Sequence, residues 1–247
     1  MDAAARENTS ITFSAIFNFR DAGGHAGLGG RRVRSGRLYR SDSLHRLDEV
    51  DREAFVRLGI RTVIDLRRPY EVERDGRVPA YDGLSYVHIH PEHREWDEVP
   101  YDERQSLARY LADRYLDLAE TGASGLARAV GMIADERAAP VVVHCVAGKD
   151  RTGVVCALTL SLLGVDDAEI ARDYALSTAA SEKFGAWVAQ FLPDEKPPPP
   201  PFLASPVEAM LLFLAELRER HGSVERYLLD AGLSAEQMAS LRAHLLH

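Results

Sequence analysis

Apolar and polar positions follow two periods along the chain, and these predict alternating strands and helices. The runs at 62–66 and 141–143 are typical of buried strands, and the alternation at 86–90 predicts a third strand. Strands that alternate with helices favour the α/β class, with a central, mostly parallel sheet flanked by helices and a C-terminal helical cluster. The helical period, with apolar residues three and four positions apart, occurs at 48–58, 124–134, 152–163, 167–176, 181–191, 206–220, 224–229 and 235–246.

Three stretches depart from this alternation. Residues 10–44 are rich in Gly and Arg, which predicts an extended segment followed by a hairpin or loop. Residues 91–118 are acidic, aromatic and helix-prone, and we expect them to cover a site rather than to join the sheet. The proline run 197–201, within 192–206, predicts a polyproline-like surface connection. Because the helices after it are too few to stand alone, we expect residues 1–247 to form a single domain.

Composition and charge narrow the function classes. A chain of 247 residues can bury a core without disulfides or metal ions, and its formal net charge of -8 disfavours nucleic-acid binding. A small pocket can still concentrate positive potential around an anionic substrate. No apolar run approaches about 18 residues, so we expect no integral membrane association. The chain has two cysteines, and its first residues lack the basic end and apolar run of a secretory signal. A cytoplasmic location is therefore the simplest expectation, and secretion without a signal peptide stays open.

The segment 141–153, Val-Val-Val-His-Cys-Val-Ala-Gly-Lys-Asp-Arg-Thr-Gly, carries the most informative chemistry. It predicts a buried strand that runs into a tight loop and then into a helix. Successive N–H groups in such a turn form an anion-binding nest, and the positive end of the helix points into the same space. The candidate phosphate-binding residues are Val146, Ala147, Gly148, Lys149 and Thr152.

Cys145 and Arg151 face each other across this predicted turn. A guanidinium can grip two phosphate oxygens at once, which an ammonium cannot do. A cysteine beside cations at a helix N-terminus has a pKa of roughly 3.5 to 7.5, against about 8.5 for a free thiol, so we expect an anionic nucleophile at neutral pH. His144 is expected to orient the loop, and the Thr152 hydroxyl to donate to the sulfur. Cys156 lies within an apolar helix, which favours a structural role.

The loop lacks the Gly-x4-Gly-Lys-Ser/Thr pattern of nucleotide triphosphate sites and an acidic pair for magnesium. This favours metal-independent hydrolysis of a phosphomonoester through a cysteinyl phosphate, with no cofactor. His88, His90 and His93 are more typical of strand-end or cover histidines than of a zinc site. Two alternatives stay open, a small-metabolite phosphatase and a non-catalytic phosphate-binding module. The second is disfavoured because binding alone does not need a thiol.

The string at 144–153 resembles the signature loop of the cysteine-dependent phosphatases, and within them it is most similar to the atypical bacterial protein tyrosine and lipid phosphatases. Segments 18–24, 31–41, 59–67 and 173–177 are similar too, so the resemblance covers most of the chain. It implies a cysteine-phosphatase fold with a helical lid insertion, for which 91–120 is the candidate. It also implies activity on phosphotyrosine, with dual specificity or phosphoinositide activity in some members.

The resemblance also implies roles for individual residues. Cys145 is the nucleophile, Arg151 the phosphate clamp and Asp150 an in-loop general acid, while Lys149 contacts an additional substrate phosphate. Other cysteine phosphatases carry the acid on a separate loop, which makes Asp97 the alternative. Asp150 is preferred because it is fixed beside the phosphate, and geometry comes before pKa in choosing an acid.

Several charged or polar residues are candidates for supporting roles. We expect them to fix the loop and Arg151 through charge-assisted hydrogen bonds, with ordinary surface ion pairs as the alternative. The substrate is expected to be a phosphorylated protein, a phosphoinositide or a small phosphomonoester, and the sequence does not indicate the oligomeric state. The supporting candidates are Asp65 and Arg67 at a strand end, and Asn18, Arg20 and Asp21 near the start of the chain.

Overall fold

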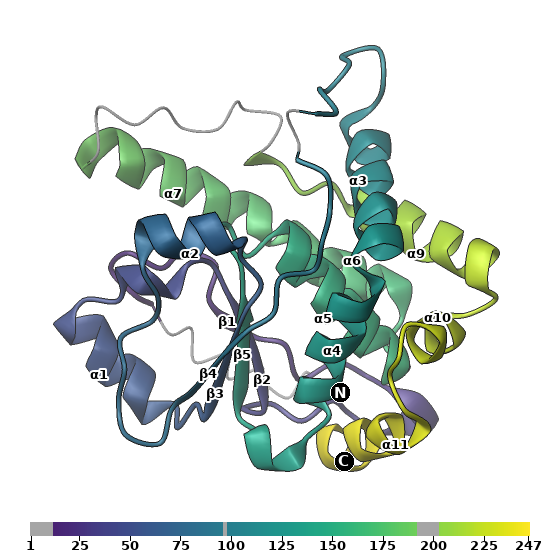
Figure 1. Cartoon of the computed structure of the whole chain (residues 1–247), viewed down its shortest axis with the longest axis horizontal. Helices are drawn as coiled ribbons and strands as arrows, with labels where there is room; N and C mark the ends of the chain where they lie inside the picture. Colours follow the sequence, from purple (N-terminus) through teal and green to yellow (C-terminus); the bar gives the residue numbers. More distant parts are fainter. Residues whose placement is uncertain (1–11, 96–97, 192–202) are drawn as a thin grey trace, which may run out of the picture.

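The computed structural model describes residues 12–95, 98–191 and 203–247, and it contains a five-stranded sheet with helices on both faces (Figure 1). The strand order is β1-β2-β5-β3-β4, in which β1 is antiparallel to β2 and every other pair is parallel. This confirms the mostly parallel α/β architecture. The strands are β1 (Arg20–Asp21), β2 (Leu38–Ser41), β3 (Thr62–Asp65), β4 (Ser85–His88) and β5 (Val141–His144).

The eight helices expected from periodicity are all present, within a few residues of the expected bounds. Helices α1 and α2 lie on one side of the sheet, and α4, α5 and α6 lie on the other (Figure 1). The helices are α1 (Glu49–Arg57), α2 (Pro69–Asp75), α3 (Leu107–Thr121), α4 (Ala123–Ile133), α5 (Asp150–Leu162), α6 (Asp167–Ala175), α7 (Ser177–Phe191), α9 (Val207–His221), α10 (Val224–Asp230) and α11 (Ala235–Leu245).

Strand β5 occupies the centre of the sheet, and its side chains divide the core in two. Val141 and Val143 join the larger apolar cluster with α3 to α6 and the C-terminal helices, whereas Val142 joins the smaller cluster beside α1. Successive residues of a strand point to opposite faces, so a central strand covered on both faces must be apolar throughout. This is why the triple-valine run predicted a buried strand, and it fixes where the following loop begins.

Helix α3, in the region that we expected to cover a site rather than to join the sheet, lies outside the sheet and also packs into the core. Tyr110, Leu111, Tyr115 and Leu118 are buried, and they pack in the larger cluster. Their spacing creates one apolar face, and that face must be covered because burying a large apolar side chain stabilises the fold by about 1.5–3 kcal/mol. Helix α3 packs against α9 and is therefore part of the helical layer. Most of the proline-rich connection, including 197–201, lies outside the described residues.

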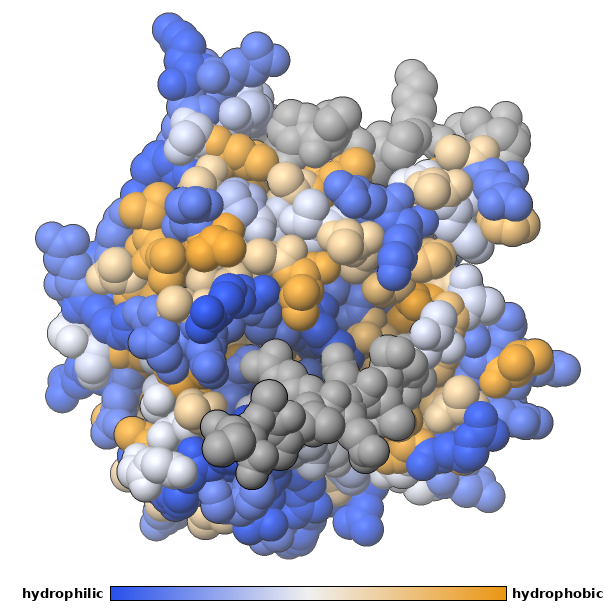
Figure 2. Space-filling view, turned by 180° about the vertical axis from the view of Figure 1, so that it is seen from behind, coloured by the Kyte–Doolittle hydropathy of each residue, from blue (hydrophilic) through white to orange (hydrophobic). Residues whose placement is uncertain are grey.

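The surface opposite to the view of Figure 1 mixes hydrophilic and hydrophobic residues. Figure 2 shows hydrophilic residues around most of its periphery, with hydrophobic residues in smaller groups across the middle and upper part. Among the described helices, none has both the length and the apolar character needed to cross a bilayer.

Two valines on helices provide a matched test of the core. Val155 in α5 is completely buried, whereas Val50 in α1 is 77% exposed. We expect Val155→Ala to lower the free energy of unfolding by about 2 kcal/mol, because two buried methyl groups are lost and a cavity remains. Val50→Ala should change it by less than about 0.5 kcal/mol. Urea unfolding followed by circular dichroism measures both, and equal losses would contradict the placement of α5 in the core.

Candidate active site

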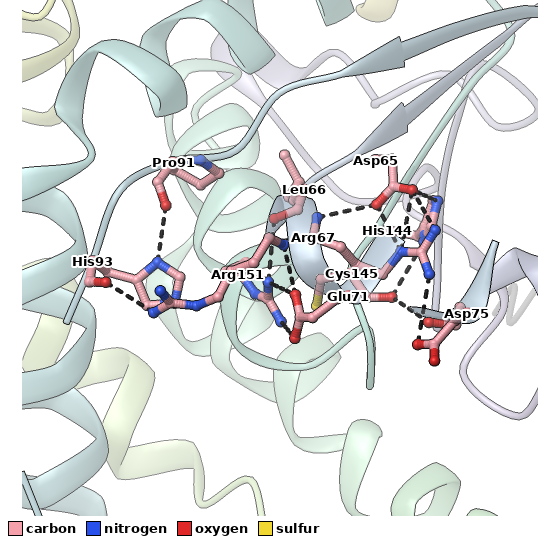
Figure 3. Close-up of polar contacts among 12 residues, drawn as sticks. Asp65, Leu66, Arg67, Glu71, Asp75, Pro91, His93, His144, Cys145 and Arg151 are labelled. Atoms are coloured by element: carbon pink, nitrogen blue, oxygen red, sulfur yellow. Dashed lines mark hydrogen bonds and ion pairs between the residues drawn. The ribbon is translucent and has the colours of Figure 1, made fainter. Parts of the chain in front are cut away.

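The signature segment forms a loop at the carboxyl end of β5, where it joins α5. Cys145 is the first residue after the strand and is buried, and Arg151 lies in the first turn of α5. Strand β3 ends beside β5 at the same edge, so Leu66 and Arg67 follow it into the same region (Figure 3). Ligand sites in parallel α/β sheets form at this edge because the connecting loops meet there.

Every peptide carbonyl from Cys145 to Gly148 accepts a hydrogen bond from a residue behind the loop. The three residues that donate come from the N-terminal segment and from the end of β2, far from the loop in sequence. Such bonds hold a loop in one conformation, because a buried carbonyl left without a partner costs about 1–3 kcal/mol. The bonds run from Ser43 Oγ to Cys145 (3.2 Å), Ser43 N to Val146 (3.0 Å), Asn18 Nδ2 to Ala147 (2.8 Å) and Arg40 Nη2 to Gly148 (2.8 Å).

These bonds determine where the loop N–H groups point. In a trans peptide the N–H lies opposite to the preceding carbonyl, so outward carbonyls turn the next N–H groups inward. Within the part of the chain that the structure describes, the N–H groups of Val146, Ala147 and Gly148 donate no hydrogen bond. The loop therefore presents consecutive N–H groups for an anion, as its sequence predicts.

Gly148 is the one loop position where the backbone excludes a side chain. Its φ is +65°, and a Cβ atom there would lie 2.3 Å from the carbonyl oxygen of Ser41. Both the left-handed conformation and the contact with β2 therefore require glycine. The contact brings the loop against β2, where Arg40 can reach the Gly148 carbonyl.

Arg151 is held by a carboxylate that the sequence analysis missed. Glu71 binds its guanidinium through two hydrogen bonds, with Nη1 to Oε2 at 2.6 Å and Nη2 to Oε1 at 3.1 Å, and Nη1 also donates to the Leu66 carbonyl (Figure 3). Burial opposes the charge, but the Cys145 sulfur and Glu71 outweigh it and raise the pKa of Arg151. The guanidinium therefore stays charged while it is turned toward the loop.

Glu71 owes its position to the start of helix α2, an element that the sequence analysis did not predict. Pro69 is the first residue of the helix, and Glu71 Oε2 accepts from the backbone N–H of Arg68 at 2.6 Å, which satisfies an N–H group at the helix start. Proline at the first helical position followed by Glu at the third is a usable signal for a helix start. At the other end of α2, the Gly76 carbonyl accepts from Arg67 at 2.8 Å.

Asp65 and Arg67 form a completely buried ion pair behind the loop, with Arg67 Nη2 2.6 Å from Asp65 Oδ2. Burial favours the protonated carboxyl, but His144 and Arg67 outweigh it and lower the pKa of Asp65. His144 Nε2 lies 3.5 Å from the same oxygen, and His144 Nδ1 lies 3.2 Å from the Cys145 carbonyl oxygen. The pair thus borders the strand end that carries the cysteine, and it secures α2 rather than contacting Arg151 directly.

A second buried cluster secures the other side of the loop. Asp173 in α6 accepts from Arg40 Nη1 at 2.6 Å and from Arg20 Nε at 2.8 Å. Burial opposes ionisation, but the two arginines outweigh it and lower the pKa of Asp173. Arg20 also donates to Asn18, whose amide holds the loop. Arg40 is buried because its charge is paired with Asp173 near the end of a central strand.

Asp150 is positioned by tyrosines from the helical layer. Tyr115 donates to Asp150 Oδ1 at 2.6 Å, and its oxygen lies 2.6 Å from that of Tyr174. Burial and the Asp150 carboxylate raise the pKa of Tyr115 well above its usual range, so it remains a donor. The Lys149 ammonium is buried, donates to the Ala204 carbonyl at 3.1 Å and lies 3.7 Å from Asp150 Oδ1.

The remaining candidates occupy different places. Asp21 accepts from the N–H groups of Gly23 and Gly36 and has no hydrogen bond to the loop among the described residues, so it supports the β1–β2 connection instead. Asp97 lies outside the described residues. The buried Thr152 hydroxyl has no hydrogen-bond partner among the residues that the structure describes, which leaves it available to a ligand or to the sulfur.

The histidines near the cleft take backbone partners. His88 Nε2 lies 2.7 Å from the Arg67 carbonyl oxygen, and His93 Nδ1 lies 2.8 Å from that of Pro91. In the described ranges, no group of three or more His, Cys, Asp or Glu side chains is arranged to hold a metal ion.

A cleft of about 280 Å³ opens over the loop. It combines the phosphate-loop residues with side chains from the start of α2, from the segment after β4 and from α3. The lining residues are Arg68, Tyr70, Glu71, His93, Glu95, Arg114, Tyr115, Leu118, Ala147, Lys149, Asp150 and Arg151.

Comparison with known proteins gives one family. The model of the Tyrosine phosphatase family matches residues 11–247. The Triple specificity protein phosphatase PtpB of Mycobacterium tuberculosis is 33% identical over 243 residues, covering 80% of this chain and 86% of the relative. A Tyrosine-protein phosphatase of Nostoc commune is 28% identical over 206 residues, covering 80% of this chain and 70% of the relative. The crystal structure of P. aeruginosa TpbA aligns with a TM-score of 0.32 at 16% identity, covering 76% of this chain and 90% of that one.

Two glycines allow the loop geometry to be tested. Gly148 and Gly59 have nearly equal φ angles of +65° and +64°, but only Gly148 lacks room for a Cβ atom. Both alanine variants carry the left-handed backbone cost of about 1 kcal/mol. We expect Gly148→Ala to lose at least about 2 kcal/mol more and to lose tungstate binding, because the loop must move away from β2. Urea unfolding and calorimetric titration with tungstate measure both effects. Equal behaviour of the two variants would contradict the close packing of the loop on β2.

Proposed function

The chain belongs to the tyrosine phosphatase family, a family of cysteine-dependent phosphatases, and from this premise we propose that it hydrolyses phosphotyrosine through a cysteinyl-phosphate intermediate without a metal ion. One observation carries the proposal. The loop carbonyls are bonded from behind, so that the N–H groups surround the space in front of Cys145, with the guanidinium of Arg151 at its edge. A tetrahedral phosphate dianion fits such a set of donors.

In the first step, the Cys145 thiolate attacks phosphorus. A sulfur–phosphorus bond forms while the bond from phosphorus to the tyrosine oxygen breaks. The loop N–H groups and Arg151 hold the three nonbridging oxygens, whose charge develops in the transition state. The Asp150 carboxyl gives its proton to the departing oxygen, and Tyr115 keeps the aspartate directed at that position.

In the second step, water hydrolyses the cysteinyl phosphate. The Asp150 carboxylate accepts a proton from the water as the water oxygen bonds to phosphorus and the sulfur–phosphorus bond breaks. Inorganic phosphate and the thiolate result, and Asp150 is again protonated for the next cycle. The buried Thr152 hydroxyl donates to the sulfur as it leaves, a role that fits its lack of another partner in the described structure.

The wall of the cleft supports phosphotyrosine as the substrate class. Tyr70 and Leu118 line it beside the loop and can pack against an aromatic ring. The relative named a triple specificity phosphatase supports wider activity, which we extend to phosphoserine, phosphothreonine and phosphoinositides as secondary substrates. Specificity constants for matched phosphopeptides, phosphoinositides and sugar phosphates would rank these classes, and a preference for sugar phosphates would favour a metabolite phosphatase instead.

The two cysteines give a direct test of the nucleophile. In the presence of a chelator, the protein is expected to release phosphate from a phosphotyrosine peptide, and Cys145→Ser should lower kcat by roughly 10³-fold or more. Cys156→Ser is the matched control. Burial raises the pKa of Cys156 to about 11, so this thiol stays protonated and plays no part in attack. Activity retained in Cys145→Ser, or lost in both variants while both remain folded, would contradict the assignment.

A comparison of two substrates with different leaving groups tests Asp150 as the acid. We expect Asp150→Asn to lower kcat/KM for phenyl phosphate by about 10²-fold or more, because general acid catalysis contributes about 10²–10⁴-fold. The loss should be much smaller for p-nitrophenyl phosphate, whose leaving group needs little protonation. Tyr115→Phe should lower kcat/KM in the same pattern, with a larger loss for phenyl phosphate than for p-nitrophenyl phosphate, but both losses should be smaller than in Asp150→Asn. Equal losses on both substrates in Asp150→Asn would show that another group is the acid.

A further inference from the structure

Two arginines that line the cleft, Arg68 and Arg114, are not used by the proposed chemistry. Arg114 in α3 is only 10% exposed, and it lines the cleft together with Asp150 and Arg151. Its Nε and Nη1 atoms are buried and have no hydrogen-bond partner among the described residues. The guanidinium carbon lies 5.8 Å from the centre of the Tyr110 ring, a contact with an aromatic face rather than with an acceptor.

The nearest carboxylate does not satisfy Arg114. Asp117 Oδ2 lies 3.9 Å from Arg114 Nη1, beyond hydrogen-bond distance. Asp117 Oδ1 already accepts two hydrogen bonds from Arg94, one of them from Nε at 2.8 Å. Burial opposes ionisation, but Arg94 outweighs it and lowers the pKa of Asp117. The acidic partner of Arg114 is thus committed to another arginine.

The other cations of the wall have close partners. Arg68 Nη1 lies 2.7 Å from Glu95 Oε1, and Arg151 is bound by Glu71. Lys149 donates to the Ala204 carbonyl. Arg114 therefore has the least satisfied charge of the wall. A buried guanidinium without hydrogen bonds carries a desolvation cost that a ligand with acceptor oxygens can remove.

We propose that Arg114 forms a second anion subsite, which binds a carboxylate or phosphate on a residue next to the phosphotyrosine of a substrate peptide. This inference rests on the proposed function. Arg114 lines the same cleft as Tyr115, whose hydroxyl bonds Asp150, so the subsite adjoins the position of the departing tyrosine oxygen. A planar guanidinium can bind two oxygens of a carboxylate or of a phosphate at the same time. The subsite can therefore take either an acidic or a phosphorylated residue next to the phosphotyrosine.

Substrate preference tests the subsite. The probes are two pairs of phosphotyrosine peptides, and the members of each pair differ only in having Glu or Gln beside the phosphotyrosine. In one pair this residue precedes the phosphotyrosine, and in the other pair it follows. For the wild-type protein, we expect kcat/KM to be about tenfold higher for the Glu peptide in at least one pair, as for a charge-assisted hydrogen bond. The ratio should fall as salt rises from about 0.05 to 0.5 M, because salt screens the attraction. A phosphotyrosine neighbour should be preferred at least as strongly as Glu.

Three variants separate the subsite from a structural role. Arg114→Gln should bring the Glu/Gln ratio close to one, and Arg114→Glu should reverse the preference in favour of a Lys neighbour. Arg104→Gln removes the same charge from a highly exposed residue outside the cleft lining and should keep the wild-type ratio. Because each ratio is taken within one protein, a change in the folded fraction cancels. A structural role alone would not reverse the preference.

The outcomes are distinguishable. If the wild-type protein hydrolyses neither peptide, the proposed function fails, and the subsite inference fails with it. If it hydrolyses both at equal rates, or if Arg114→Gln keeps the preference, the proposed function stands and the subsite is overturned. If Arg114→Gln alters only the preference for inositol bisphosphate over inositol monophosphate, the peptide assignment is likewise overturned.

Discussion

The site depends on the hydrogen bonds that hold the loop carbonyls from behind. A loop can turn several N–H groups toward one anion only when its carbonyls turn the other way and are satisfied there. In this protein Ser43, Asn18 and Arg40 provide those partners, and Gly148 permits the close approach to β2 that the arrangement needs. Burying Arg40 for this purpose is costly by itself, and the paired carboxylate of Asp173 offsets the cost.

Arg151, the proposed phosphate clamp, is held by a separate set of contacts. Arg151 is charged and turned toward the loop because Glu71 binds it, and Glu71 is in place because α2 begins at that point. The buried Asp65–Arg67 pair connects the end of β3 to the end of α2. Both supports come from the carboxyl edge of adjacent parallel strands. Neighbouring strand ends thereby fix the distance between the nucleophile and the clamp.

The helical layer contributes residues both to the core and to the site. Helix α3 buries its apolar face against α9, and this packing sets the position of Tyr115, which bonds Asp150. The same helix contributes Arg114 to the wall of the cleft. A single packed element therefore connects core stability, the position of the proposed acid and the proposed selection of substrate. The residue proposed to select the substrate lies beside those proposed to act on phosphorus, without belonging to the loop.

The sequence by itself determined three of the four parallel strands, eight of the helices and the candidate phosphate loop, because local periodicity and a short contiguous motif carry that information. The proposed nucleophile and clamp could be named for the same reason, and the family resemblance added the proposed in-loop acid. Only the tertiary structure decided the partners of the loop, since Arg40, Glu71, Tyr115 and Asp173 are far from it in sequence and each belongs to a different element. It also decided that α3 packs in the core. A charge's partner depends on which elements the fold brings together, and no local pattern specifies that.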